Sequence, residues 1–389
     1  MIASMQTVVL ADWLWNGDQL LADPVLELED GHIRSIGTRS TRELPGHSER
    51  LHYPGAILAP SFFDVHIHGA AGHDVMEATP ESLHTISRFL ASRGTGSFLA
   101  TTVTAPLDAT LRSVERLAKL LHSPDWPGAT PLGIHLEGPF LSHAKRGVHP
   151  PEHLLAPSIP IFDRLWDAAD GHLRLMTLAP ELPGAAELAA HAVSRGVRVS
   201  VGHSNATAAE TGQVLGAGAN SATHTFNAMR PLDHREPGIL GVALTTDSLF
   251  AELICDGIHV DPAMVRLWWR MKGRERGILI TDAMAATGMP DGEYQLGGFN
   301  VQVANGRATA NGVLAGSVLT LDQALVNFLA FTGANPAQAL PLLTRNPATM
   351  TGLSARAGSL VPGQPANFVA LAPNGALLAS LIAGKPATR

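Results

Sequence analysis

Eight short apolar runs, rich in β-branched residues and separated by stretches with helical periodicity, constrain the fold of this chain more than any other feature. Short apolar runs bounded by turn residues are typical of buried strands, and apolar residues spaced by three or four are typical of helices. Eight strands that alternate with helices predict an α/β fold, a TIM-like (β/α)₈ barrel. The runs are Phe62–His68, Ser97–Thr104, Leu132–Glu137, Leu173–Ala179, Arg198–His203, Ser221–Phe226, Ala251–Ile258 and Gly277–Asp282.

The predicted helices lie between and after these runs, several with a glycine just past the end, as a C-cap requires. The segment Met229–Ser248 contains Arg-Glu-Pro-Gly and is expected to be a longer loop with at most a short helix. The helices are Pro80–Arg93, Leu107–Leu121, Ile159–Ala169, Ala185–Arg195, Ala206–Leu215, Pro262–Lys272, Leu319–Phe331, Pro336–Leu343 and Asn346–Leu353.

The two ends of the chain have a different pattern, with short β-runs separated by turn signals such as Asn374-Gly375. Neither end is long enough to bury a core well alone. We therefore expect residues 1–60 and 356–389 to pair into one small β-sandwich domain beside a (β/α)₈ barrel over residues 61–355. The runs are Thr7–Leu10, Val25–Glu29, Ile33–Ile36, Gly55–Leu58, Ala366–Leu371 and Leu377–Ala383.

Composition excludes several classes of protein. The 389 residues carry 27 Lys+Arg against 34 Asp+Glu, a net charge of −7, which excludes a basic nucleic-acid-binding surface. With 45% hydrophobic and 16% charged residues the chain is not mainly disordered. No run approaches the roughly 18 apolar residues of a membrane span. One cysteine and the lack of a signal-peptide pattern lead us to expect a reducing, cytoplasmic location.

Histidine is abundant, with 18 residues, and two of them end the first predicted strand. Side chains at positions i and i+2 of a strand project to the same face, so His66 and His68 would both point into the mouth of the barrel. Two imidazoles on one face can bind one metal ion. Taken alone, the pair also fits an ordinary half-buried strand.

Glu137 ends the third run, after largely apolar residues and before a Gly-Pro turn. A carboxylate in such a place is costly to bury unless a cation is near, so it fits a metal ligand, although a strand-end carboxylate can also turn to solvent. His135 has the same parity as Glu137. It is either a group that supports the ligands or a residue deeper in the barrel.

His203, His224 and Asp282 end the fifth, sixth and eighth runs. With the first and third runs, five strands end in imidazoles or carboxylates at the face where barrel active sites are built. This set indicates a Zn²⁺-class or other first-row divalent ion. Such an ion lowers the pKa of bound water, and Asp282 is our candidate for the carboxylate that moves the proton in hydrolysis at a carbonyl or similarly polarised carbon.

The other residues with reactive side chains fall outside the strand-end pattern. Cys255 fits a small buried hydrophobic residue. The histidines interpreted as surface or packing residues are His32, His47, His52, His122, His153, His172 and His191.

The layout and several strings resemble the N-acetylglucosamine-6-phosphate deacetylase family of the amidohydrolase superfamily, nearly end to end. A glutamate on strand three, here Glu137, takes the place of the carbamylated lysine of many amidohydrolases. The strings are Leu136-Glu137-Gly138-Pro139-Phe140, Val201-Gly202-His203-Ser204, Thr223-His224-Thr225-Phe226-Asn227-Ala228-Met229, His234-Arg235-Glu236-Pro237-Gly238, Asp256-Gly257-Ile258-His259-Val260 and Thr281-Asp282-Ala283.

The resemblance implies metal ligands and a general acid/base. Glu137, His203 and His224 would hold the main ion, and His66 and His68 would complete a second site, so that one or two divalent ions bind per subunit. Zn²⁺ is the first expectation, with Fe²⁺, Mn²⁺ and Co²⁺ as alternatives. The general acid/base matches Asp282.

The resemblance also implies a substrate site. His259 matches a histidine that polarises the acyl oxygen, and His149 matches one on a mobile loop near the sugar. Asn227, the backbone of Ala228 and Arg235 match a phosphate-binding set, with Arg235 supplied by the neighbouring subunit of a homodimer. An arginine suits a dianionic phosphate because its guanidinium forks onto two oxygens, although a surface arginine paired with an acid such as Glu236 is the simpler interpretation.

The implied reaction is removal of acetate from N-acetyl-D-glucosamine 6-phosphate to leave D-glucosamine 6-phosphate, in amino-sugar catabolism or recycling. Two alternatives stay open. A cyclic-amide hydrolase or a deaminase would share the metal site but would not depend on a phosphate. A non-catalytic protein that keeps the barrel would bind no metal ion. The sequence leaves acceptance of the N-acetylgalactosamine isomer and of other acyl groups open.

Overall fold

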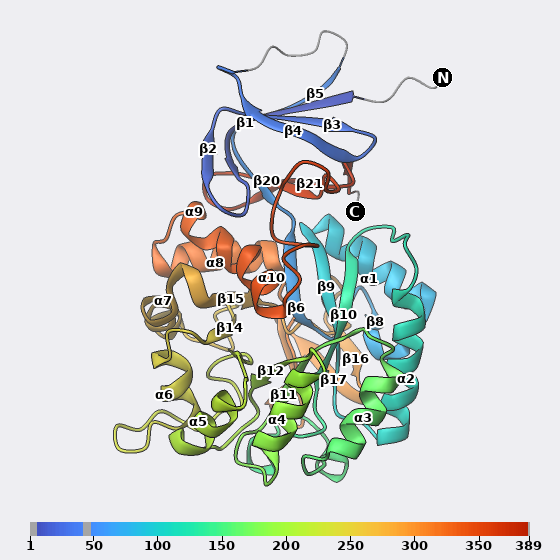
Figure 1. Ribbon diagram of the computed structural model, residues 1–389, viewed down its shortest axis with the longest axis vertical. Coiled ribbons are helices and arrows are strands. Elements are labelled where there is room, and N and C mark those ends of the chain that lie inside the picture. Colours follow the sequence, from blue (N-terminus) through green and yellow to red (C-terminus); the bar gives the residue numbers. More distant parts are fainter. Residues whose placement is uncertain (1–5, 42–47, 388–389) are drawn as a thin grey trace.

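The computed structural model describes residues 6–41 and 48–387, and Figure 1 shows a barrel with a smaller β domain at one end of its long axis. The barrel contains eight parallel strands whose order in the sheet equals their order in the chain. This confirms the predicted (β/α)₈ fold. The strands are β6 (Phe62–Ile67), β9 (Thr95–Thr102), β10 (Thr130–Glu137), β11 (Leu173–Leu178), β12 (Arg198–Val201), β13 (Ser221–Ala222), β14 (Phe250–Ile254) and β15 (Gly277–Ile280).

The barrel closes between its first and last strands just past their carboxyl ends. The backbone N–H of Asp282 donates to the carbonyl of His66 at 2.9 Å, and the N–H of His68 donates to the carbonyl of Ala283 at 2.8 Å. The closure therefore fixes His66, His68 and Asp282 beside one another.

Helices surround the barrel because each presents an apolar stripe to it. In α2, Val114, Leu117, Ala118 and Leu121 are buried at the spacing of one helical face. The predicted helices are confirmed, including the short helix α6 in the long loop. They are α1 (Pro80–Ser92), α2 (Leu107–Leu121), α3 (Ile159–Ala168), α4 (Ala185–Ser194), α5 (Ala208–Gly216), α6 (Gly238–Thr245), α7 (Pro262–Arg276), α8 (Leu321–Thr332), α9 (Pro336–Ala339) and α10 (Arg345–Thr351), with 3₁₀ turns at Val75–Glu77, His143–Lys145, Pro151–His153 and Leu340–Leu342.

The two chain ends pair as predicted. Their strands form one continuous sheet, in which β5 pairs with β1 from the N-terminal part and with β20 from the C-terminal part. Both parts line one core that includes Leu26 and Phe368, so the sheet curls over its own interior. The strands are β1 (Gln6–Trp15), β2 (Leu20–Ala22), β3 (Pro24–Glu29), β4 (His32–Thr38), β5 (Glu49–Pro60), β20 (Phe368–Leu371), β21 (Leu377–Ile382) and β22 (Lys385–Pro386).

Two small antiparallel sheets were not predicted. One joins β7 (Gly69–Ala70) and β8 (His73–Asp74) after the first barrel strand. The other is a four-stranded meander after the last barrel strand: β16 (Gly292–Leu296), β17 (Phe299–Ala304), β18 (Arg307–Ala310) and β19 (Val313–Leu314).

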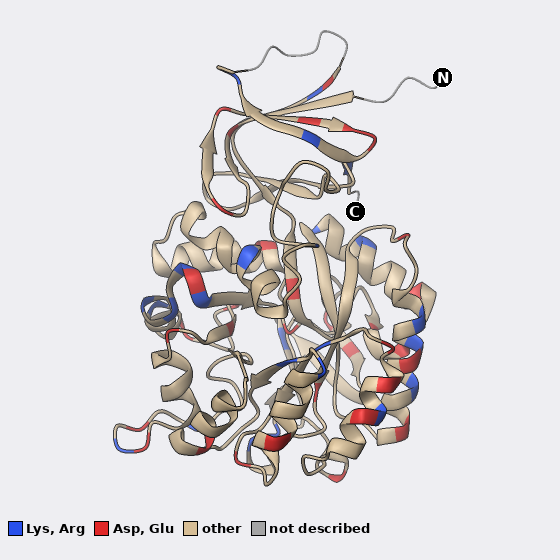
Figure 2. Ribbon diagram, viewed as in Figure 1, with Lys and Arg blue, Asp and Glu red and all other residues tan. Residues whose placement is uncertain are grey.

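Charged side chains of both signs are spread over the helices, with several on α2 (Figure 2). One pair on that helix joins Lys119 to Glu115 at 2.8 Å, and another joins its Asp108 to Arg164 at 3.6 Å. Among residues 6–41 and 48–387, no helix is long and apolar enough to cross a membrane.

Candidate metal centre

The predicted ligands and the predicted acid/base Asp282 lie at or just past the carboxyl ends of five barrel strands. Glu137 is the last residue of β10, while His203, His224 and Asp282 follow β12, β13 and β15. These last three have positive φ angles of 46°, 27° and 50°. Left-handed backbone is costly for residues with a Cβ, and such strain is concentrated at functional sites. Here the turn at each strand end directs the side chain into the mouth of the barrel.

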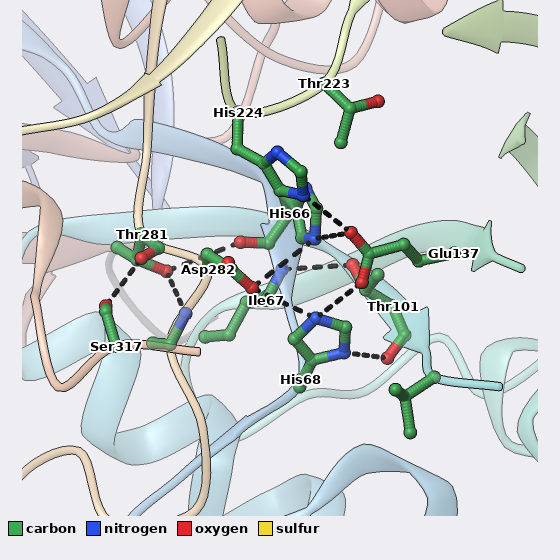
Figure 3. Close-up of polar contacts among 12 residues, drawn as sticks. His66, Ile67, His68, Thr101, Glu137, Thr223, His224, Thr281, Asp282 and Ser317 are labelled. Atoms are coloured by element: carbon green, nitrogen blue, oxygen red, sulfur yellow. Dashed lines mark hydrogen bonds and ion pairs between the residues drawn. The ribbon is translucent and has the colours of Figure 1, made fainter. Parts of the chain in front are cut away.

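The carboxylate of Glu137 lies at the centre of the cluster, as Figure 3 shows for the histidines that it labels. Its Oε1 lies 3.3 Å from His66 Nε2, 3.2 Å from His203 Nε2 and 3.1 Å from His224 Nε2. Its Oε2 lies 3.2 Å from His68 Nε2. The residues predicted as metal ligands are therefore brought together in one place.

The hydrogen bonds of three imidazoles fix which nitrogen faces the centre. The Nδ1 atoms of His68 and His203 lie 3.1 and 2.9 Å from the carbonyls of Thr101 and Lys145, and Nδ1 of His66 lies 3.3 Å from a carboxylate oxygen of Glu252. Carbonyls and carboxylates only accept, so each Nδ1 carries a proton. When these three rings are neutral, the Nε2 atom of each carries a lone pair that faces the centre of the cluster.

The Nε2 atoms of the cluster lie close to one another and to carboxylate oxygens. His203 Nε2 and His224 Nε2 are 3.0 Å apart, and His66 Nε2 is buried without a hydrogen-bond partner among the residues that the structure describes. A shared proton or a cation is needed between two ring nitrogens this close together. Nitrogen and carboxylate oxygen atoms in this number are the ligands that first-row divalent ions take in proteins, so the donor set fits such an ion.

The buried carboxylates and histidines of the cluster shift one another's pKa values. Burial raises the pKa of the Asp282 carboxyl, but the charge of His66 and the hydrogen bond from His68 outweigh it and bring the pKa to about 2. Burial lowers the pKa of His68, yet its hydrogen bonds to Asp282 and Glu137 raise it to about 9. Asp282 is therefore a carboxylate at neutral pH. Protons and a divalent ion compete for the same imidazole nitrogens.

A cavity of about 360 Å³ opens onto this centre. The predicted substrate residues Asn227, Ala228, His259 and His149 all line it, together with His68, Glu137, His203, His224 and Asp282. The unpredicted meander supplies Leu296, Val313 and Leu314 to another wall. A larger cavity of about 840 Å³ lies between α1 and α8, away from the ligand cluster.

His259 and His149 each have a specific partner. His259 Nδ1 lies 2.6 Å from Asp256 Oδ2, and the other oxygen of Asp256 accepts the backbone N–H of His259 at 2.8 Å. His149 is buried, with Nδ1 2.8 Å from the hydroxyl of Thr104 and Nε2 3.5 Å from Glu137. The ring of His149 therefore contacts the metal centre itself as well as the cavity.

Arg235 is the one predicted substrate-binding residue that does not line the cavity. Its side chain is exposed on the loop before α6, and no ion pair holds it among the described residues. The simpler interpretation, a pairing with Glu236, is wrong. Glu236 instead accepts the backbone N–H groups of Ala208 and Gly238, at 2.8 and 3.2 Å.

The remaining histidines and the cysteine lie as expected. His135 is deep in the barrel, 2.9 Å from the hydroxyl of Thr177, and burial holds its pKa well below its usual range. Cys255 is buried. His47 lies outside the described residues. The histidines that are exposed or half-buried, as predicted, are His32, His52, His122, His153, His172 and His191.

Three carboxylates near the centre were not predicted. Asp256 holds His259, Glu252 contacts His66, and Asp64 accepts the hydroxyl of Thr281 at 2.6 Å. Burial raises the pKa of Asp64 to about 7. A carboxylate inside an otherwise apolar β-run is the signal that could have identified Glu252 and Asp64.

Comparison with known proteins places the chain in a family. The profile of the amidohydrolase family matches residues 57–387, most of the chain. The chain belongs to the amidohydrolase family. An N-acetylgalactosamine-6-phosphate deacetylase of Escherichia coli O157:H7 is 40% identical over 94% of this amidohydrolase and 95% of its own length. An N-acetylglucosamine-6-phosphate deacetylase of Lysinibacillus sphaericus is 39% identical, over 88% of this chain and 87% of its own length.

Solved structures agree with this amidohydrolase over its whole length. The N-acetyl-D-glucosamine-6-phosphate deacetylase of Mycobacterium smegmatis, in complex with N-acetyl-D-glucosamine-6-phosphate, has a TM-score of 0.91 at 35% identity and covers 99% of this chain and 100% of its own. The N-acetylglucosamine-6-phosphate deacetylase of Pasteurella multocida has a TM-score of 0.90 at 28% identity, and the match covers 98% of this chain and 99% of that one. The predicted family and fold are confirmed.

Proposed function

We propose that this amidohydrolase removes the acetyl group from N-acetyl-D-glucosamine 6-phosphate and releases acetate and D-glucosamine 6-phosphate. The observation that supports it most is the convergence of Glu137, the histidines and Asp282 at the floor of a cavity walled by Asn227, Ala228 and His259. The deacetylases among its relatives act on phosphorylated N-acetylhexosamines, as their names state.

Glu137, His203 and His224 would hold the main divalent ion, and His66 and His68 a second, with Zn²⁺ as our first choice over Fe²⁺, Mn²⁺ and Co²⁺. A bound ion supplies a Lewis acid that polarises the acetyl carbonyl and eases deprotonation of water.

Asp282 performs the proton transfers. Its carboxylate, ionised at neutral pH, accepts a proton from the attacking water as the new C–O bond forms. It then gives this proton to the amide nitrogen as the C–N bond breaks, so that the sugar leaves as an amine and the acyl group as acetate. The position of Asp282 Oδ1, 3.1 Å from His68 Nε2, supports this role.

His259 stabilises the developing negative charge on the acetyl oxygen. The Asp256 carboxylate, 2.6 Å from Nδ1, holds the ring at the wall of the cavity, where the acetyl oxygen would bind. His149 borders the sugar from the opposite loop.

The phosphate would bind to Asn227, to the backbone N–H of Ala228 and to the partner subunit's Arg235 in a homodimer. Two observations support the dimer: Arg235 is exposed and away from its own cavity, and Leu232 on the same loop is 52% exposed. Exposed large apolar side chains of this kind are frequent at interfaces.

Acetate release tests the proposal. We expect release from N-acetylglucosamine 6-phosphate with a much higher kcat/KM than from plain N-acetylglucosamine, by protein whose divalent metal content is measured on the same preparation. Because a relative acts on the galactosamine isomer at 40% identity, N-acetylgalactosamine 6-phosphate is the second candidate substrate. Equal rates with and without the phosphate would favour a different amide hydrolase. Protein without bound metal would favour a non-catalytic role.

A further inference from the structure

Glu252 is a fully buried carboxylate inside the barrel, in the middle of the apolar strand β14. Its Oε2 lies 3.3 Å from Nδ1 of His66 and accepts the backbone N–H of His224 at 3.2 Å. Its Oε1 is buried without a hydrogen-bond partner in the described part of the chain. The residue therefore contacts two ligand-bearing segments without entering the cavity.

We propose that Glu252 is a positioning residue that makes His66 a metal ligand and so sets how tightly the position between His66, His68, Glu137 and Asp282 binds a divalent ion. This inference rests on the proposed metal-dependent function. It adds to that function a residue that touches neither substrate nor ion.

The argument begins with the tautomer of His66. A carboxylate only accepts hydrogen bonds, so Glu252 selects the ring with a proton on Nδ1 and a lone pair on Nε2. That lone pair faces Glu137 at 3.3 Å and Asp282 at 3.5 Å. With the opposite tautomer, His66 would present an N–H to the centre and would not coordinate an ion.

Packing restricts the position of the ring but does not choose its tautomer. The His66 ring is buried, with centroids 5.2 Å from the ring of His68 and 4.8 Å from that of His135. Neither contact distinguishes a protonated Nδ1 from a protonated Nε2, because both act through the ring edges and faces. The Glu252 carboxylate supplies this distinction.

The charge of Glu252 adds to the same effect. No lysine or arginine forms an ion pair with Glu252 among the described residues. Its negative charge is therefore offset only by the histidines of the cluster and by a bound cation. Glu137, Asp282 and Glu252 together place three carboxylates around the imidazoles. An excess of buried negative charge favours a divalent cation nearby, and more so a second one.

The test compares Glu252→Ala and Glu252→Gln with the wild type. Zn²⁺ affinity is measured by competition with a chelating dye, and Tm is measured with a chelator and with Zn²⁺. Glu252→Ala is expected to bind Zn²⁺ roughly 10- to 100-fold more weakly, as for other residues that orient a ligand. Its Tm in chelator should fall, because the backbone N–H of His224 and Nδ1 of His66 lose their acceptor, and its Tm gain from Zn²⁺ should shrink as well. Glu252→Gln, which keeps an oxygen for Nδ1–H, should recover part of the affinity.

A matched control is Asp322→Asn. Asp322 is also a buried carboxylate on a barrel element, but it pairs with Arg93 at 2.7 Å outside the metal centre. This variant should lower Tm equally with and without Zn²⁺ and leave the affinity unchanged.

Two results would overturn the inference alone: Zn²⁺ affinity of Glu252→Ala equal to that of the wild type, or an equal loss of Tm with and without Zn²⁺, which indicates a purely structural role. If Glu252→Ala does not fold, Glu252→Met decides, since it fills similar space without an acceptor for Nδ1–H, and wild-type Zn²⁺ affinity in that variant overturns the inference. A wild-type protein that binds no divalent ion would overturn the proposed function as well.

Discussion

The position of Asp282 shows how much of this site depends on single residues. It follows the last barrel strand, with its carboxylate 3.1 Å from His68 Nε2 and 3.5 Å from His66 Nε2. It therefore lies beside the metal ligands while still facing the cavity, which suits a group that accepts and returns a proton.

Asp282→Asn should keep the shape of the site but remove the base. We expect kcat to fall roughly 10²- to 10⁴-fold, because an amide neither accepts the proton of water nor returns one to the amine. The main ion should stay bound, as metal content measured on the same preparation would show, since Glu137, His203 and His224 remain. A near-normal kcat in this variant would remove Asp282 from the mechanism.

Arg235→Ala should act through the phosphate. Loss of a charge-assisted contact is expected to raise KM for N-acetylglucosamine 6-phosphate roughly 10- to 100-fold with a smaller effect on kcat. Plain N-acetylglucosamine is the internal control, because it offers nothing for Arg235 to bind. An equal loss on both sugars would show that Arg235 does not recognise the phosphate.

Sequence reasoning identified the candidate ligands but not the residues that orient them. His66, His68 and Glu137 were identified because strand parity and position at a strand end are local properties. Glu252 and Asp256 act through contacts with His66 and His259, and the contact with His66 joins residues 186 positions apart. Such a pairing depends on the closed barrel, which no local pattern specifies.

At the scale of elements, the end of α6 depends on a buried lysine of α7. Lys272 Nζ donates to the carbonyls of Ala243 and Thr246, at 3.0 and 2.8 Å. Burial lowers the pKa of Lys272 to about 8 from the usual 10.5.

The shifted pKa predicts a dependence of stability on pH. Between pH 8 and pH 10.5 the unfolded chain holds the Lys272 proton while the folded chain has lost it, so the free energy of unfolding rises with pH on account of this group. Urea unfolding of wild type and Lys272→Met should show the difference between them growing in favour of the wild type, on the order of 3 kcal/mol across this range. Other groups titrate alike in both proteins. A difference that stays constant with pH would contradict the shift.

The sequence predicted the barrel strands and helices but not the meander β16–β19. The barrel strands and helices were identified because apolar periodicity is strong where one face is buried. The meander β16–β19 was missed because its strands alternate with exposed residues and glycine turns at the surface, as in Gly292–Leu296. It nevertheless supplies one wall of the cavity.

At the scale of the whole molecule, the β domain is joined to the barrel through buried contacts. Trp15 of β1 packs in the barrel core, and its Nε1 donates to the hydroxyl of Thr344 at 3.3 Å. The first strand of the β domain is therefore fixed to the barrel by a buried side chain. The sequence indicated only that the two chain ends have a similar pattern.

The proposed homodimer predicts the effect of a surface charge. Leu232→Glu should convert the dimer to a monomer in light scattering and raise KM for the phosphorylated sugar as Arg235→Ala does, because a charge is costly to bury at an interface. Leu378→Glu is the matched control, since Leu378 is 55% exposed on the β domain against 52% for Leu232. A protein that is monomeric without any change, yet binds the phosphorylated sugar tightly, would contradict the shared site.

Anomalous diffraction at the zinc edge, from crystals of the zinc-loaded protein, tests the account most directly. We expect a peak within bonding distance of Glu137, His203 and His224, with any second peak beside His66 and His68. Zinc bound only elsewhere, or a peak absent from this centre at full zinc occupancy in solution, would contradict the proposal that these residues form a metal site.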